Sequence, residues 1–404
     1  MTPGARKRIG FLSFGHWQPI PGSRTRTARE ALVQTIELAE VAEALGLDGA
    51  FVRVHHFARQ LASPFPLLAA IGARTSRIEI GTAVIDMRYE NPLYMAEEAA
   101  AADLISDGRL QLGISRGSPE PALRGSESFG HVPREGQSDA DLARAHAEEF
   151  RAAIAGAGVA RADTGPDRPP AMLAIQPRSP GLPERIWWGS GTRGTAAWTA
   201  EQGMNLMSST LLTEDTGVPF DELQAEQIAL YRAAWAEAGW EREPRVSVSR
   251  SVLPVTTDQD RAYFGSGGGR EASDQLGYLD GGIARFGRSY IGEPDVIAEE
   301  LARDVAVRGA DTLLLTVPNQ LGVEYNAHLL KTIAEHVAPA IGWQPAGRSR
   351  PASSARSACS IPLGDRRARS CLGRGPRHRL RLSRTATSTC WAAPAAAAAA
   401  RRSA

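Results

Sequence analysis

The chain has 404 residues, of which 43% are hydrophobic and 23% charged, the usual balance of a globular protein with a sizeable core. Its formal net charge of +1 conceals an uneven distribution, because residues 346–404 hold 13 arginines and a single acid. The rest of the chain is therefore acidic, which disfavours a nucleic-acid enzyme, since neutralising phosphates requires a basic face.

Strand and helix patterns alternate along residues 8–338. For example, the apolar residues Leu32, Ile36 and Ala39 recur at roughly helical spacing, and Gly46 follows them as a helix stop. In chain order the expected elements are strand 8–14, helix 28–45, strand 48–54, helix 66–74, strand 77–85, helix 92–105, strand 109–115, helix 139–155, strand 185–189, helix 195–202, strand 204–208, helix 221–238, strand 245–253, strand 312–317 and helix 325–338.

Eight strands joined by helices without an internal linker predict one α/β domain over residues 1–345, a (β/α)8 TIM barrel. An open doubly wound sheet is the competing fold. It would carry a G-x-G-x-x-G fingerprint after its first strand, and this chain has none there.

Residues 264–287, after the seventh expected strand, are rich in glycine. They include Gly265, Gly267, Gly268, Gly269, Gly281 and Gly282. Such a density of glycine within a barrel connection predicts a mobile insertion. Composition leaves two roles open for it, a lid that closes over the site and a tolerated insertion without function.

The last segment, residues 346–404, is rich in Arg, Ala, Ser and Pro, has no lysine and shows neither helical nor strand periodicity. We expect a disordered tail, because such a composition buries too little apolar surface to fold. Two further interpretations remain open, a polybasic arm for RNA or anionic lipid and an out-of-frame translation product. The last would explain the enrichment in arginine and alanine without lysine, which shifted GC-rich codons produce.

All three cysteines, Cys359, Cys371 and Cys390, lie in this tail. The preceding residues thus contain no disulfide framework, thiolate nucleophile or cysteine-based metal site, which suits a reducing cytoplasm. The longest apolar run, residues 392–400, is broken by Pro394 and is too short to span a membrane. The N-terminus also lacks the apolar run of a secretory signal. We therefore expect a cytoplasmic protein without membrane association.

Active sites of β/α barrels form at the carboxyl ends of the strands, so the residues that follow each strand carry the chemical information. Here they are mainly His, Arg, hydroxyl and aromatic side chains: His16, Trp17, His55, His56, Asp86, Arg88, Tyr89, Ser115, Arg116 and the turn 190–195. Such a ring suits an anionic, planar ligand. The turn precedes a helix, so its amides and hydroxyls could receive a phosphate beside Arg116. Thr192 or Thr195 could equally cap that helix, and the two roles are compatible.

The adjacent His55 and His56 do not predict a metal site. Neighbouring residues of a strand point to opposite faces, and the chain has neither an H-E-x-x-H motif nor a third clustered ligand. We expect one of the pair to face the barrel mouth for proton transfer or hydrogen bonding, and the other to pack in the interior. His16 is equally well placed, with a structural role as its default.

A series of short motifs follows a fixed order along residues 8–340. They are 51–57 (FVRVHHF), 81–84 (GTAV), 91–92 (NP) with 96–98 (AEE), 103–109 (DLISDGR), 112–117 (LGISRG) and 198–203 (WTAEQG). Each motif alone is modest, but their ordered combination resembles the luciferase-like flavin monooxygenases, the bacterial luciferase superfamily. The resemblance implies a TIM barrel with a mobile, glycine-containing segment after strand seven. It also implies FMN, or a deazaflavin in one branch, bound across the mouth.

The resemblance further assigns cofactor contacts. Arg116, Thr192 and Thr195 are expected to contact the FMN phosphate, and Gly191 to add a backbone contact. Ser115 is also expected to contact the cofactor. It stands where bacterial luciferase has a reactive cysteine, which rules out thiol chemistry at that position.

The flavin ring is expected against Ala83 and Val84, where members of the family often have a non-prolyl cis peptide. His55 matches the catalytic histidine of the family. An acid commonly precedes this histidine, whereas this chain has Arg53 and Val54 there. The resemblance therefore supplies no hydrogen-bond partner for the imidazole.

The implied activity is that of an FMN-dependent monooxygenase, acting on paired donors with incorporation of dioxygen into a small organic substrate. No nicotinamide fingerprint is present, so a separate flavin reductase is expected to supply reduced FMN. Two alternatives remain, a deazaflavin-dependent hydride-transfer oxidoreductase on the same barrel and a flavin-binding protein without turnover. We expect a homodimer, because dimers are usual in the family.

The candidate substrate residues at the mouth form a polar set. They are His16, Trp17, Arg53, Arg88 and Tyr89. A long aliphatic aldehyde would not require such a set. The sequence therefore favours a polar or acidic substrate without identifying it.

Overall fold

The fold is taken from a computed structural model of the chain. The structure describes residues 6–117, 121–164, 169–214, 217–265, 274–279 and 282–346, with the backbone alone for 275–279 and 282–285. The predicted tail from residue 347 onward lies outside the described residues, as do Gly267, Gly268, Gly269 and Gly281 of the expected insertion. The division of the chain at residue 345 and the mobility of the insertion thus stay predictions.

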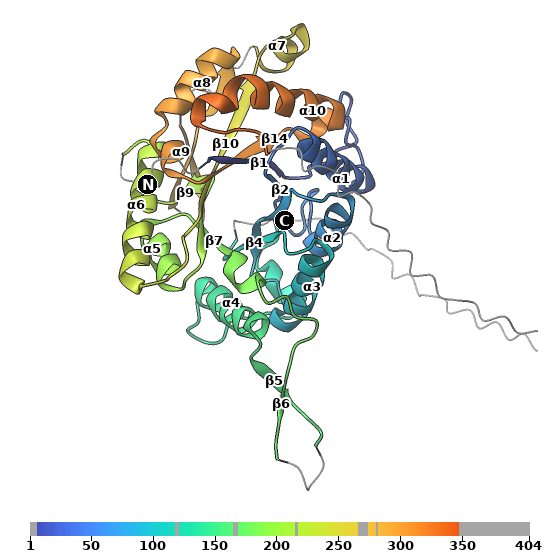
Figure 1. Cartoon of the computed structure of the whole chain (residues 1–404), viewed down its shortest axis with the longest axis vertical. Coiled ribbons are helices and arrows are strands. Elements are labelled where there is room, and N and C mark those ends of the chain that lie inside the picture. The colour runs from blue at the N-terminus through green and yellow to red at the C-terminus, as the bar shows by residue number, and fades with distance from the viewer. Residues whose placement is uncertain are drawn as a thin grey trace, which may run out of the picture. The chain divides into compact units, whose positions relative to one another are not determined.

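Eight parallel strands close into a barrel in the described part of the chain (Figure 1). They are β1 (Arg8–Ser13), β2 (Gly49–Val52), β3 (Glu79–Asp86), β4 (Leu110–Ser115), β7 (Ile186–Ser190), β8 (Asn205–Ser208), β10 (Val246–Pro254) and β14 (Thr312–Val317). Neighbours in this order pair in parallel, and the pairing of β14 with β1 closes the ring. The single TIM barrel predicted from the sequence is confirmed.

Helices surround the strands on the outside of the barrel (Figure 1). The α-helices are α1 (Ala28–Ala44), α2 (Pro64–Arg74), α3 (Pro92–Ile105), α4 (Asp139–Ala155), α5 (Arg193–Glu201), α6 (Phe220–Ala238), α7 (Asp258–Phe264), α8 (Pro294–Arg303), α9 (Val305–Gly309) and α10 (Gly322–Thr332). Short 3-10 turns cover Gly125–Phe129, Leu182–Arg185, Asn319–Leu321 and Ala338–Ile341, and a π turn covers Ile333–Val337. Within the described residues, every helix is too short or too polar to cross a lipid bilayer.

Capping residues set several helix starts. Thr27 and Ser138 form capping boxes at α1 and α4. α2 begins at Pro64, two residues before its predicted start, because proline suits the first position of a helix. α5 begins at Arg193 and not at Thr195, because the side chain of Thr192 is its N-cap and accepts a hydrogen bond from the Thr195 N–H.

The barrel is filled from its amino-terminal end. A cluster of apolar side chains occupies the interior: Leu12, Phe51, Trp187, Met207 and Leu314. Nearer the amino ends of the strands, Glu79 accepts two hydrogen bonds of 2.9 Å from Arg245 and one of 3.0 Å from Arg8. The interior is thus packed, as in other barrels of this size, and space for a ligand is expected at the carboxyl ends.

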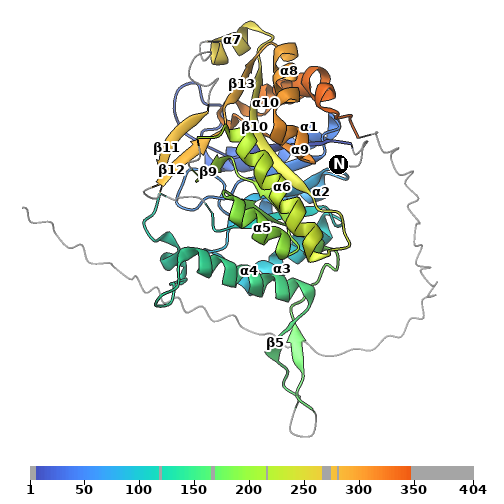
Figure 2. The ribbon, with the colours of Figure 1, turned by 90° about the vertical axis from the view of Figure 1, so that its left-hand side faces the viewer.

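The predicted insertion after the seventh barrel strand contains strands that the sequence did not reveal. After α7, β11 (Gln275–Leu279) and β12 (Gly282–Phe286) pair in antiparallel fashion. β12 also pairs with the short β9 (Leu211–Leu212), which follows β8 (Figure 2). β13 (Ser289–Gly292) then returns parallel to β10. The insertion is therefore joined to the barrel at two places.

A second pair of strands stands apart from the barrel. β5 (Gly158–Arg161) and β6 (Met172–Ala174) lie between α4 and β7 and form an arm that projects outward (Figure 1). The expected elements include no strand between the helix 139–155 and the strand 185–189. Residues 165–168, between the two strands, lie outside the described residues.

Candidate active site

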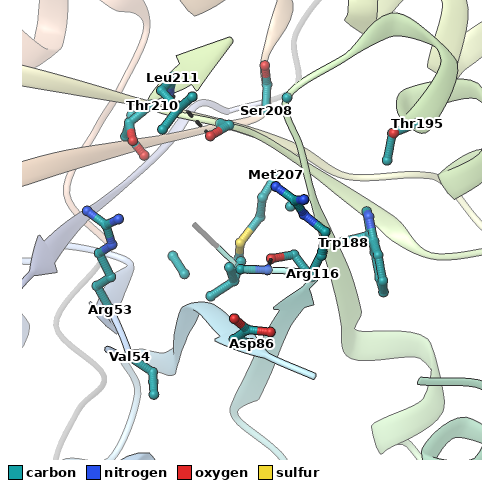
Figure 3. Close-up of a pocket in the computed structure, with 18 of the residues that line it drawn as sticks. Arg53, Val54, Asp86, Arg116, Trp188, Thr195, Met207, Ser208, Thr210 and Leu211 are labelled. Atoms are coloured by element: carbon teal, nitrogen blue, oxygen red, sulfur yellow. Dashed lines mark hydrogen bonds between the residues drawn. The ribbon is translucent and has the colours of Figure 1, made fainter. Parts of the chain in front are cut away.

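A cavity of about 520 Å³ opens at the carboxyl ends of the barrel strands, the place where the sequence predicts a site (Figure 3). Its size is typical of pockets that bind small organic ligands or cofactors. Most of the predicted site residues line it: Arg53, His55, Ala83, Val84, Ser115, Arg116, Gly191, Thr192 and Thr195. The roles assigned to these residues stay predictions.

The other predicted substrate residues, His16, Trp17, Arg88 and Tyr89, do not belong to this lining. His16 stacks on Phe14 with 5.6 Å between the ring centroids. The Arg59 guanidinium lies over the Trp17 ring, 5.4 Å from its centroid. Both side chains therefore pack beside the mouth.

Arg88 is held by two carboxylates. Its Nη2 donates to Asp86 at 2.6 Å, and its Nη1 donates to Asp139 at 2.6 Å. Asp86 lines the cavity and is 2% exposed, and burial raises its pKa although Arg88 opposes the shift. Gly117 packs directly against this carboxylate with a φ of +83°, and a Cβ atom at this position would clash with Asp86 Oδ2. Arg88 therefore fixes Asp86 from outside the cavity.

The two adjacent histidines separate in the way the sequence predicts. His55 lines the cavity, whereas His56 stacks on Tyr89 with 4.3 Å between the ring centroids. His55 is 9% exposed, and burial, with smaller contributions from Arg53 and His16, lowers its pKa to about 4. Its imidazole is therefore neutral at neutral pH, with one ring nitrogen able to accept a hydrogen bond. Among the described residues, no group of three or more His, Cys, Asp or Glu is arranged to hold a metal ion.

β3 supplies an apolar wall at Ala83 and Val84. The peptide bond between them is cis, in agreement with the resemblance, and the pairing of β3 with β4 shifts register between Thr82 and Ile85. A Cβ atom on Gly189 would lie 3.1 Å from Val84 Cγ1, so glycine at this position lets β7 approach the wall closely. Such a wall suits the face of an aromatic ring.

The amino terminus of α5 meets the cavity through two threonines. Thr192 Oγ1 accepts from the Thr195 N–H at 3.2 Å and donates to Thr195 Oγ1 at 2.9 Å. Thr192 thus caps the helix and also lines the cavity, and its contact with a phosphate stays a prediction. Glu214 accepts from the Arg193 N–H at 3.0 Å, so one amide of the first turn already has an anionic partner. Arg116, just beyond β4, adds a positive charge to the same cavity.

Several lining residues were not predicted as site residues. They are Arg144, Trp188, Met207, Ser208, Ser209, Thr210, Leu211 and Thr213. Ser208 ends β8 and residues 209–211 follow it, so the rule that strand ends surround the mouth could have found them. Arg144 had no such signal, because it lies on α4 and reaches the cavity from outside the barrel, with its guanidinium 4.8 Å from the Trp198 ring centroid.

A closed β/α barrel with a partly basic, partly apolar cavity at its carboxyl end defines a ligand-binding barrel whose site is built on strand ends. The family model described as luciferase-like monooxygenase matches residues 10–263, and the chain belongs to this family. The resemblance seen in the sequence motifs is thereby confirmed.

One curated relative is the oxygenase component of the flavin-dependent trigonelline monooxygenase of Acinetobacter baylyi, which is 31% identical over 110 residues. The match covers 27% of this chain and 30% of that protein, so it spans less than a third of the relative's length.

Two solved structures share the fold. The oxygenating constituent of 3,6-diketocamphane monooxygenase from Pseudomonas putida, in complex with FMN, has a TM-score of 0.59 at 18% identity, covering 83% of this chain and 98% of that one. The coenzyme F420 dependent tetrahydromethanopterin reductase of Methanopyrus kandleri has a TM-score of 0.53 at 13% identity, covering 83% and 99%. At these identities the likeness concerns the fold alone.

Proposed function

We propose that the protein is a monooxygenase that uses reduced FMN and dioxygen to oxygenate a small organic substrate. The observation that carries the proposal is one cavity that combines the apolar Ala83–Val84 wall with a helix amino terminus and Arg116. The wall suits the face of an isoalloxazine ring, and the helix terminus with its arginine suits a phosphate. Family membership, the flavin dependence of the trigonelline relative and the FMN bound in the diketocamphane enzyme support this assignment.

The residues at the start of α5 fit a phosphate group. Arg116 and the Thr195 hydroxyl would bind it, with Thr192 and Gly191 beside them. Because Glu214 accepts from the Arg193 N–H and Thr192 accepts from the Thr195 N–H, the phosphate would meet the Gly194 N–H of the first turn. A Cβ atom on Gly194 would meet nothing within 4 Å, so this part of the turn is open. Ser115 would border the same cofactor from the end of β4.

Bound reduced FMN would supply two electrons, so that one atom of dioxygen enters the substrate and the other leaves as water. The chain would orient the substrate, exclude water and handle protons. Leu12, Met207 and Leu314 keep the centre of the cavity apolar. His55, neutral at neutral pH, would hydrogen-bond to the substrate or the cofactor and take part in moving protons there.

A separate reductase would deliver the reduced FMN. The trigonelline relative is itself an oxygenase component, which supports a two-component arrangement here. A homodimer and a cytoplasmic location belong to the same proposal, because both are inferred from the sequence and its resemblance.

Binding of FMN, riboflavin and a deazaflavin coenzyme to the full chain tests the cofactor. We expect FMN to bind about tenfold more tightly than riboflavin or better, because its phosphate forms charge-assisted hydrogen bonds. Arg116→Gln should remove most of this preference. The control Arg303→Gln changes an arginine of α8 that is 74% exposed and should retain it. Equal affinities for FMN and riboflavin in the unmodified protein would contradict the phosphate site.

Turnover is tested by loading the protein with reduced FMN without oxygen, adding a panel of small organic substrates and admitting isotopically labelled dioxygen. We expect one labelled oxygen atom in the product, detected by mass spectrometry. His55→Gln should retain FMN binding and lose most of the turnover. Preference for the deazaflavin would instead indicate a hydride-transfer oxidoreductase. Tight FMN binding without labelled product from any substrate would favour a non-catalytic flavin-binding protein.

A further inference from the structure

One side chain at the floor of the cavity contains sulfur. The floor consists of Leu12, Met207 and Leu314, which belong to the apolar cluster inside the barrel and also line the cavity. Within the lining that the structure describes, Met207 is the only residue with a sulfur atom. Figure 3 shows its side chain near the middle of the lining residues. The floor therefore holds one thioether, a group that oxidants convert to a sulfoxide.

The fold directs this thioether into the barrel. Successive residues of a strand point to opposite faces, and Leu206 of β8 packs in the core that includes the surrounding helices, so Met207 points inward. A Cβ atom on Gly113 would lie 2.7 Å from Met207 Sδ, so the glycine of β4 makes room for the sulfur. Ala83 and Val84 pack against the same cluster. The thioether thus lies close to β4, in the cluster that supports the Ala83–Val84 wall.

Exposure separates Met207 from the other methionines that the structure describes. Met87 and Met95 are 0% exposed and Met204 is 1% exposed, and none of the three lines the cavity. Met172 of β6 is 57% exposed and also lies outside the lining. Met207 is 5% exposed and lines the cavity. A small oxidant can therefore reach Met172 from the solvent and Met207 through the cavity, whereas the other three are covered.

We propose that Met207 is a site of oxidation by hydrogen peroxide formed in the cavity, and that its sulfoxide weakens binding of the cofactor. The inference rests on the proposed function, because dioxygen that takes two electrons from the reduced cofactor and two protons, without a substrate, becomes hydrogen peroxide. The sulfur would attack one peroxide oxygen, so that an S–O bond forms while the O–O bond breaks. The other oxygen would leave as water after taking the proton of the transferred hydroxyl. The sulfur is thereby oxidised by two electrons, and the peroxide is reduced.

The sulfoxide would change the chemistry of the floor. A thioether is apolar and makes favourable contacts with aromatic rings, whereas a sulfoxide is polar. Its oxygen would lie among the apolar side chains of Leu12, Leu314 and the Ala83–Val84 wall. We expect the affinity for FMN to fall about tenfold, because a polar group buried without a hydrogen bond is unfavourable. Turnover without a substrate would therefore reduce the affinity of the enzyme for its own cofactor.

Hydrogen peroxide added to the full chain without flavin tests the site directly. Peptide mass spectrometry follows each methionine as a gain of one oxygen atom, and FMN affinity is measured before and after treatment. We expect Met172 and Met207 to be oxidised ahead of Met87, Met95 and Met204. FMN at ten times its Kd leaves about a tenth of the cavities free, so it should slow oxidation of Met207 about tenfold and leave that of Met172 unchanged.

Two leucine variants connect the modification to binding, each compared with its own untreated form. Met207→Leu should keep its FMN affinity after peroxide treatment, because leucine replaces the thioether with a hydrocarbon side chain of similar size. Met172→Leu is the matched control at an exposed methionine, and it should lose affinity about tenfold, as the unmodified protein does. Cys359, Cys371 and Cys390 are present in both variants, so their oxidation cannot explain a difference between them.

A second arm forms the peroxide at the site itself. The protein is loaded with reduced FMN, and dioxygen is admitted with catalase present and without an organic substrate. We expect oxidation of Met207 while Met172 is spared, because catalase removes the peroxide that has left the cavity. Equal oxidation of the two methionines would contradict attack within the cavity.

The arm with added peroxide separates this inference from the proposed function. Met207 that resists doses which fully oxidise Met172, or that is oxidised without loss of FMN affinity, would overturn the inference. Absent FMN binding in the untreated protein, with Met207 still oxidised ahead of the three covered methionines, would refute the proposed cofactor and uphold the oxidation site.

Discussion

Replacing Asp304 with asparagine tests its buried ion pair with Arg250, which lies where β13 leads from the insertion back to the barrel. Asp304 and Arg250 of β10 are each 3% exposed, and Arg250 donates to the two carboxylate oxygens at 2.7 and 3.1 Å. Tyr290 of β13 donates to the same carboxylate at 2.6 Å, and the Val307 N–H donates at 2.8 Å. Asparagine preserves the shape of the side chain but leaves the Arg250 guanidinium buried opposite a neutral amide.

The expected loss in the free energy of unfolding for Asp304→Asn is about 3–5 kcal/mol, because the remaining charge is uncompensated in the interior. Tyr290→Phe removes one hydrogen bond to a charged group and should cost about 1.5–3 kcal/mol. Arg303→Gln serves as the control, since it breaks a pair with Glu299 in which both side chains are more than 70% exposed. Its cost should stay below about 1 kcal/mol.

Urea unfolding followed by circular dichroism at pH 7 measures the three losses, provided each transition is two-state. A loss for Asp304→Asn no larger than that of the control would refute the reasoning. Acid adds a second readout. Burial alone would raise the pKa of Asp304, but Arg250 and Tyr290 outweigh it and hold the pKa below its usual value. The carboxylate therefore contributes fully above about pH 3.9 and loses its contribution as pH falls through the lowered pKa, a loss that Asp304→Asn should lack.

Three further outcomes are expected. Thr192→Ala and Thr27→Ala each remove an N-cap hydrogen bond of 3.2 Å from a backbone N–H to the threonine hydroxyl. Each should lower the free energy of unfolding in urea by about 1 kcal/mol, but only Thr192→Ala should weaken FMN binding. The His55 ring should stay neutral down to about pH 4, so an NMR titration that shows protonation near the usual pKa would contradict its burial. Gly117→Ala should lose roughly 1–3 kcal/mol, because its φ of +83° is strained for alanine and its Cβ would strike Asp86, and a thermal melt like that of the unmodified protein would exclude this clash.

The barrel could be predicted from the sequence because its signals are local. Each strand is a short apolar run, and a segment with helical periodicity follows it, so the sequence shows a repeating β/α unit. Eight such units commonly close into a barrel. The same rule placed Arg116, Thr192 and His55 together, since the carboxyl ends of parallel strands meet at one mouth. Residues far apart in the sequence could therefore be predicted to share one cavity without knowing which of them are in contact.

Side chains were harder to place where a specific partner decides their direction. Arg88 follows a barrel strand, yet Asp86 and Asp139 hold its guanidinium away from the cavity. Tyr89 stacks on His56, a contact between two strand ends that no spacing within either segment encodes. The strands of the insertion were missed for a similar reason, because β12 finds its partner β9 after a different barrel strand and glycine obscured its strand pattern.

The pairing of β12 with β9 also bears on how the site could diversify. Leu211 lines the cavity and also pairs with Phe286 of β12, so the insertion is attached at the rim of the cavity. Ladder hydrogen bonds run between main-chain atoms, and most side chains leave them intact. Side chains of the insertion can therefore be exchanged while the pairing of β12 with β9 is kept. Proline at Leu211 or Leu212 would weaken this pairing, because it has no N–H to donate. Main-chain hydrogen bonds thus attach the insertion to the rim of the cavity, so its side chains can change the selectivity for ligands without changing the barrel.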